Sequence, residues 1–74
     1  MELEKKYIKK LQSASSQMLK SLKNDNLTRE EKYEWYGYIR SLRDCAYDAG
    51  ILSKTKIQEN LEEALKIIRK TKTL

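Results

Sequence analysis

The sequence predicts an all-α protein, a small antiparallel three-helix bundle that forms a single helical domain over residues 1–74. The chain contains no proline, only two glycines and 36% charged residues, a composition typical of helical proteins with few turns. Helix-breaking residues gather at only two places, 23–28 and 50–53. We therefore predict helices at about residues 2–23, 29–49 and 54–71. Short connections make sequential helices antiparallel neighbours.

The first predicted helix is amphipathic, with apolar residues at steps of three and four and lysines on the opposite side. Such a helix buries one stripe and leaves a basic outer face. The apolar stripe consists of Leu3, Tyr7, Leu11, Ala14, Met18 and Leu22, widened by Ile8 and Leu19.

The second predicted helix has clear signals at both ends. Thr28 is followed three residues later by Glu31, the spacing of a capping box that satisfies two backbone donors. Gly50 marks the other end, because glycine most readily adopts the left-handed conformation that closes a helix. Between them we expect a core stripe of Trp35, Ile39, Leu42, Ala46 and Ala49, flanked by Tyr38 and Cys45.

The third predicted helix has two candidate starts. Ser53 is favoured as N-cap, because Leu52 and Ile57 around it have the spacing of a hydrophobic staple. Thr55 with Gln58 offers a competing start. The apolar face of this helix consists of Ile57, Leu61, Ala64, Leu65 and Ile68.

The size of the core raises the question of dimerisation. A chain of 74 residues buries only about 60% of the surface that it exposes when unfolded. A lone cysteine permits no internal disulfide, so stability has to come from packing or from a partner. A dimer in which the third helix packs on a second copy is therefore the alternative to an isolated bundle.

The residue types that are missing argue against catalysis. The sequence contains no histidine, which is the usual general base and the usual partner of a nucleophilic serine or cysteine. Cys45 is expected to face the core, where a free cysteine behaves as a small hydrophobe. We therefore predict no catalytic residue, no metal site and no cofactor.

Two pairs of glutamates provide the remaining route to an enzyme. Glu31 with Glu34, and Glu59 with Glu62, form E-x-x-E pairs that resemble those with which some all-helical nucleotide pyrophosphohydrolases hold magnesium. That family usually has aspartate at the position of Glu62, and this chain is short for its helical pocket. We therefore interpret the pairs as solvated carboxylates.

One side of the second helix is not explained by packing. Tyrosine and arginine recur there at steps of three and four, and both are enriched at the centres of protein interfaces. We predict that this Tyr–Arg face binds a protein, either a larger partner or a second copy. The alternative is that the tyrosines cover the rim of the core. The Tyr–Arg face consists of Tyr33, Tyr36, Arg40, Arg43 and Tyr47.

The net charge of +5 suggests a second class of partner. The balance is +4 over residues 1–23, −2 over 24–50 and +3 over 51–74, so the outer helices carry the excess. A nucleic-acid-binding regulator is therefore the alternative function. Its contacts would be Lys5, Lys6, Lys9, Lys10, Arg69 and Lys70.

The hydropathy pattern bears on where the protein works. No apolar run approaches 18 residues, the length that a membrane-spanning helix requires, and the charged start leads into no signal-peptide core. We therefore expect a cytoplasmic protein that has no membrane partner.

Overall fold

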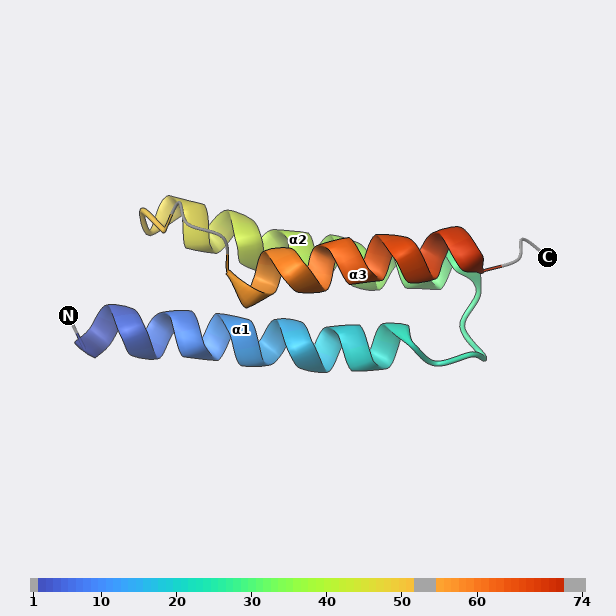
Figure 1. Cartoon of the computed structure of the whole chain (residues 1–74), viewed down its shortest axis with the longest axis horizontal. Helices are drawn as coiled ribbons and strands as arrows, with labels where there is room; N and C mark the ends of the chain where they lie inside the picture. Colours follow the sequence, from blue (N-terminus) through green and yellow to red (C-terminus); the bar gives the residue numbers. More distant parts are fainter. Residues whose placement is uncertain (1, 52–54, 72–74) are drawn as a thin grey trace.

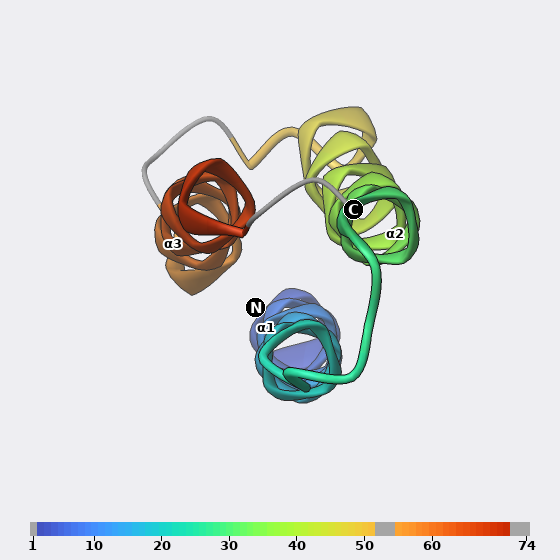
Figure 2. The same cartoon turned by 90° about the vertical axis from the view of Figure 1, so that its right-hand side faces the viewer.

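A computed structural model contains three α-helices that pack pairwise against one another: α1 (Glu2–Leu22), α2 (Arg29–Asp48) and α3 (Lys56–Lys70). The structure describes residues 2–51 and 55–71. The helices run alternately in opposite directions (Figure 1), and seen end-on they occupy the corners of a triangle (Figure 2). The bundle measures 47 × 17 × 14 Å. The predicted all-α three-helix bundle is confirmed, and the helix bounds differ from prediction by at most two residues.

The predicted capping box forms at the start of α2. The Thr28 side chain accepts a hydrogen bond from the Glu31 backbone N–H, and the Glu31 carboxylate accepts one from the Thr28 N–H, both at 3.1 Å. The Thr28 N–H, and after it the Thr28 hydroxyl, hold the pKa of the Glu31 carboxyl below its ordinary value, because each donates to the carboxylate and so stabilises its charged form. The sequence therefore fixes the beginning of α2 locally.

Gly50 ends α2 as predicted. Its φ of 83° lies in the left-handed region that glycine adopts without strain. The N–H of Gly50 donates to the Tyr47 carbonyl at 2.9 Å, and the N–H of Ile51 donates to the Ala46 carbonyl at 3.0 Å. This is the bonding pattern of a Schellman motif. Ile51 packs against the core beyond the turn.

The favoured start of the third helix was wrong. Helix α3 begins at Lys56, and its N-cap is Thr55, whose side chain accepts from the Gln58 N–H at 3.4 Å. Gln12 of α1 supplies a second acceptor, its Oε1 taking the Lys56 N–H at 3.1 Å. A side chain from another helix therefore helps to cap α3, which local sequence spacing does not reveal. Ser53 and Leu52 lie outside the described residues.

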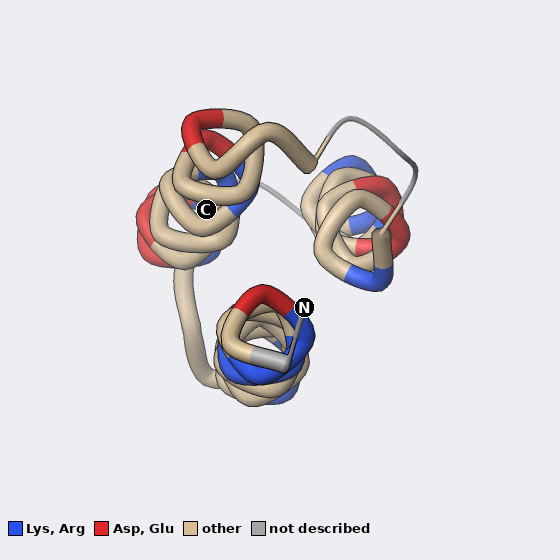
Figure 3. Tube along the Cα trace, turned by 90° about the vertical axis from the view of Figure 1, so that its left-hand side faces the viewer, with Lys and Arg blue, Asp and Glu red and all other residues tan. Residues whose placement is uncertain are grey.

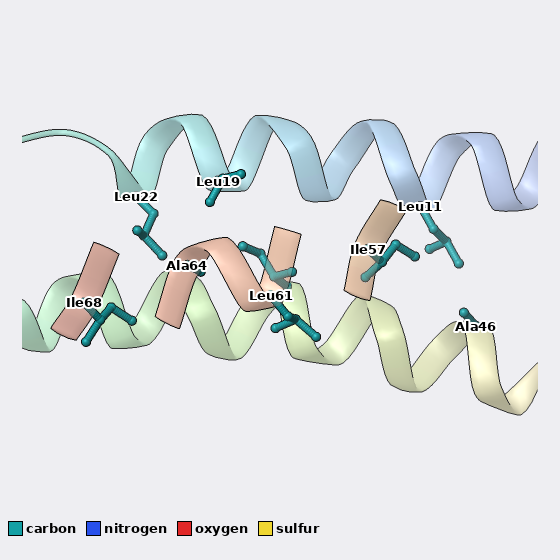
Figure 4. Close-up of a cluster of buried hydrophobic side chains, with 9 residues drawn as sticks. Leu11, Leu19, Leu22, Ala46, Ile57, Leu61, Ala64 and Ile68 are labelled. Carbon is teal, nitrogen blue, oxygen red and sulfur yellow. The ribbon is translucent and has the colours of Figure 1, made fainter. Parts of the chain in front are cut away.

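The core lies between the three helices and uses one stripe from each (Figure 4). Side chains from α1 meet those of α3 and α2 along the axis of the bundle. Trp35, Tyr36 and Leu42 pack against this cluster without being fully buried. The buried apolar residues are Leu11, Leu19, Leu22, Ile39, Ala46, Ile57, Leu61, Ala64 and Ile68.

Several residues expected in the core are exposed. Leu3 is 82% exposed and Tyr7 is also exposed, because the start of α3 lies beside Gln12 and the first turns of α1 extend beyond it (Figure 1). On α2, the side that carries Tyr38, Cys45 and Ala49 faces solvent.

The buried line of α2 runs instead through Lys32, Ile39 and Ala46. The helix is thus rotated toward Tyr36 and Arg43 relative to the prediction. Lys32 is compatible with this orientation of α2, because its long aliphatic stem can cover core surface while its ammonium finds a polar partner.

Polar contacts hold α3 in register with the other helices. Asn60 is buried, and its Nδ2 donates to Ser15 Oγ at 2.8 Å and to Ser16 Oγ at 3.1 Å. Ser15 is fully buried and donates in turn to the Gln12 carbonyl at 2.7 Å. A shift of α3 along α1 would leave these groups unsatisfied in the core.

Lys32 fixes the other end of α3. It is 5% exposed, and its Nζ donates to Thr71 Oγ1 at 3.1 Å, while Thr71 donates to the Ile67 carbonyl at 2.8 Å. The ammonium therefore lies at the C-terminal, negative end of the α3 dipole. The start of α2 and the end of α3 are joined by this contact.

We predict that Asn60→Ala lowers the free energy of unfolding by about 1–3 kcal/mol, because it leaves the buried Ser15 hydroxyl without its donor. Urea denaturation followed by circular dichroism measures this. The exposed neighbour Glu63→Ala is the control, and a loss no larger than that of the control would show that the network does not contribute. Asn60→Leu combined with Ser15→Ala removes both polar groups and should cost less than Asn60→Ala.

The lowered pKa of Glu31 makes a pH-dependent contribution to stability. Because the folded-state pKa lies below the unfolded one, this contribution is present above the ordinary carboxyl pKa of about 4.3 and is lost as pH falls through the folded-state value. We expect Glu31→Gln to flatten the fall in thermal midpoint between about pH 5 and pH 2.5, measured by circular dichroism. Glu30→Gln, which leaves the Thr28 contacts in place, should keep the wild-type profile.

Candidate protein-binding face

The five residues of the Tyr–Arg face lie along one side of α2, as their spacing predicts. The helix is continuous from Arg29 to Asp48, and Tyr33 and Tyr47 stand 14 residues apart, which is about 21 Å of helix. Tyr33 is 45% exposed and Tyr47 is 48% exposed. These two rings form the ends of the face, and Arg40 lies between them.

Each of the two exposed tyrosines carries an arginine over its ring. Arg29 Cζ lies 5.9 Å from the centroid of Tyr33, and Arg43 Cζ lies 5.6 Å from that of Tyr47. In each pair the arginine precedes the tyrosine by four residues, so both side chains lie one turn apart on the same side. Cation–π contacts at exposed sites contribute about 0.5–1 kcal/mol. The rings and guanidiniums are therefore partly ordered before any partner binds.

Tyr36 and Arg43 connect the face to the core. Tyr36 is half-buried and packs against the core cluster, so for this residue the rim interpretation describes the geometry. The Arg43 side chain is 23% exposed, its Nη2 lies 3.8 Å from Asp44 Oδ1, and its Nε is buried without a hydrogen-bond partner. Only the outer end of the Arg43 guanidinium remains for a partner.

Arg40 differs from the other arginines of the face. It is exposed, and among residues 2–51 and 55–71 it makes no ion pair, hydrogen bond or ring contact. An unpaired guanidinium offers five donors and suits carboxylate groups on a partner. Arg40 is therefore the charged group of the face that makes no such contact within the described ranges.

An acidic stripe runs beside the Tyr–Arg face on the outermost side of α2. Within it, Gly37 is exposed, and a Cβ added there would meet no atom within 4 Å. The Ser41 hydroxyl donates to the Gly37 carbonyl at 3.0 Å. The acidic stripe consists of Glu30, Glu34, Asp44 and Asp48, all exposed.

The basic residues proposed for nucleic-acid binding do not form one surface. Lysines cover the side of α1 that is turned away from the other helices (Figure 3). Arg69 and Lys70 lie in the last turn of α3, at the opposite end of a bundle 47 Å long (Figure 1). The two groups are thus separated. The α1 group consists of Lys5, Lys6, Lys9 and Lys10, all exposed.

The glutamate pairs are not gathered into a metal site in the part of the chain that the structure describes. One oxygen of the Glu31 carboxylate accepts the Thr28 N–H in the capping box. No group of three or more histidine, cysteine, aspartate or glutamate side chains that could hold a metal ion occurs within residues 2–51 and 55–71.

Arg29 is the residue of the face that sequence reasoning missed. It sits at the very start of α2, before the tyrosine stripe begins. The signal was present in the sequence, because Arg29 precedes Tyr33 by the same four residues that separate Arg43 from Tyr47. The repeated Arg-x-x-x-Tyr spacing predicts both stacked pairs.

The described helices were also considered as membrane spans, and the chain was compared with known proteins. Of the helices in the described ranges, none combines the length and the apolar character needed to cross a membrane. Comparison with known proteins gives no further guide, since neither a protein-family model, nor a curated protein, nor a solved structure matches this chain.

Proposed function

We propose that this chain is a non-enzymatic helical module that binds a larger protein through the Tyr–Arg face of α2, as an adaptor, regulator or inhibitor. The observation that carries the proposal is the pair of arginine-stacked tyrosines at the two ends of the face, with the unpaired Arg40 between them among the described residues. Neither exposed ring is needed to complete the core.

The physical support is that binding at this face costs little conformational entropy. Immobilising a flexible side chain at an interface costs about 0.5–1.5 kcal/mol. Tyrosine has few rotatable bonds, and here two of the rings already stack with arginines, while Tyr36 is held by the core. Residues that dominate the binding energy of protein interfaces offer a large contact area and a polar edge. The tyrosines of this face have both, and they are held in place before binding.

The length of the face also suits a protein partner. Its span of about 21 Å along a straight helix matches an elongated groove or a second helix better than a small molecule. Helix-in-groove recognition uses side chains at steps of three and four on one side of a helix. The Tyr–Arg face has that spacing from residue 33 to residue 47.

The test compares two triple variants in affinity capture from native cell extract treated with nuclease. The face variant is Tyr33→Ala, Arg40→Glu and Tyr47→Ala. The control is Tyr7→Ala, Lys20→Glu and Tyr38→Ala, which also removes two exposed tyrosines and reverses one exposed cation. Tyr36 is left intact because it packs against the core.

We expect the wild type and the control to recover the same protein, and the face variant to recover at least about tenfold less, a loss of about 1.4 kcal/mol or more in binding free energy. Circular dichroism should show all three proteins folded. Equal recovery by the face variant would contradict the proposal. Recovery of nucleic acid alone, lost on nuclease treatment, would instead favour the basic surface of α1, and such binding should weaken steeply with salt.

A further inference from the structure

Opposite charges stand one turn apart at the centre of the exposed side of α2. Arg40 has no partner among the described residues, and Asp44, four residues on, meets only the neighbouring Arg43 within that part of the chain, at the long distance of 3.8 Å. Both side chains are exposed. Residues four apart project from the same side of a helix, so this surface presents a positive and a negative group about 6 Å apart along the axis.

Such a pair is complementary to itself in an antiparallel arrangement. In a two-fold symmetric dimer, a contact of residue i with residue j of the other copy is repeated as j with i. Two antiparallel α2 helices centred between Arg40 and Asp44 would therefore form the same ion pair twice. A parallel arrangement would not bring these two residues to the same level.

The same register gives a role to Gly37. It brings Tyr47 of one copy to the level of Gly37 of the other, where a half-exposed ring meets a position without a side chain. Glycine weakens a helix interior relative to alanine. The fold of the single chain gives no reason for it, because an added Cβ at Gly37 would meet nothing within 4 Å.

We propose that α2 also binds a second copy of this chain, through an antiparallel contact between the two α2 helices that uses the Tyr–Arg face together with the acidic stripe beside it. Arg40 of each copy pairs with Asp44 of the other, and Tyr47 of each lies over Gly37 of the other. The inference rests on the proposed function of the Tyr–Arg face and adds a way to regulate it, because the second copy and a larger partner compete for Arg40 and Tyr47.

The dimer is weak, which suits that regulation. A contact between one helix of each copy buries less than the roughly 1,200 Å² of a stable interface, and exposed ion pairs contribute little individually. We expect a dissociation constant on the order of 100 µM, which corresponds to a weak binding free energy. At low concentration the face is free for a partner, and at high local concentration it is covered.

Charge reversal tests the register. Sedimentation velocity of the wild type from about 10 µM to 1 mM, a range chosen to bracket the dissociation constant of a weak interface, should show reversible dimerisation. Arg40→Glu or Asp44→Arg alone brings like charges together twice and should weaken the dimer at least about tenfold. The double variant Arg40→Glu with Asp44→Arg restores opposite charges and should return the constant to within about threefold of wild type. Lys20→Glu on α1, which has the same charge change as Arg40→Glu, should leave it unchanged.

A neutral variant tests the contact at Gly37. Gly37→Gln adds a solvent-facing side chain that the single chain accommodates and that favours helix. Its thermal midpoint should equal or exceed that of the wild type, while dimerisation weakens at least about tenfold because the added glutamine side chain occupies the space of the opposing Tyr47 ring. A variant that weakened dimerisation merely by unfolding would have a lower thermal midpoint than the wild type.

The outcomes separate this inference from the function on which it rests. A chain that stays monomeric to about 1 mM, single reversals without effect, or a double variant that fails to recover would each overturn the antiparallel contact. If the face variant still loses its captured partner in extract, the proposed function stands without the dimer. The double variant Arg40→Glu with Asp44→Arg should recover dimerisation but should not recover wild-type capture of a larger partner. That partner does not carry the compensating charge change.

Discussion

The hydrogen bonds that join α3 to the other two helices are the constraint on which the rest of the bundle depends. Apolar stripes alone allow neighbouring helices to slide by a turn with little loss of buried area. Polar groups in the core do not, because a buried donor or acceptor without a partner is costly. Gln12 meets the first turn of α3, Ser15 meets Asn60 in its second turn, and Lys32 meets Thr71 at its end. Register is thus fixed at three points along one helix.

That constraint also sets which side of α2 reaches solvent. With Lys32 held at the end of α3, the buried line of α2 passes through Ile39 and Ala46. Tyr36 and Arg43 then fall at the edge of the core, and Tyr33 and Tyr47 fall just outside it. The orientation of the candidate binding face is therefore held by the contact of Lys32 with Thr71 at the end of α3. Its outer tyrosine rings are held by the arginines stacked on them.

Local signals were sufficient to predict the number and order of the helices and both ends of α2, but not the start of α3. The Thr28–Glu31 capping box and the Gly50 turn depend on a few consecutive residues, and both form as expected. The rotation of α2 was not predictable in this way. Cys45 and Tyr38 follow the apolar pattern as well as Ile39 does, and only the position of the other helices decides which of them is covered. The burial of Lys32 and Asn60 is not predictable from residue type, because lysine and asparagine are mostly exposed in proteins.

The alignment of the five Tyr–Arg residues along one side of α2 was easier to predict than the core beside them. Its spacing depends only on helical periodicity, which α2 keeps over its whole length. The exposure of the individual residues of this face was not predictable. The apolar repeat of α2 allows the buried line to run beside Ile39 either toward Tyr38 or toward Tyr36, and each choice exposes different residues. Tyr36 belongs to the rim of the core, whereas Tyr33, Arg40 and Tyr47 extend from it.

The unequal lengths of the helices have a consequence for how the bundle opens. The described part of α1 buries no side chain before Leu11, and α3 starts only beside Gln12. The first two turns of α1 are therefore held chiefly by continuation of the helix, and the segment from Leu11 to Leu22 carries the packing. Amide hydrogens at the two ends of this one helix should exchange with solvent by different routes, the first by local fraying and the second only when the whole bundle unfolds.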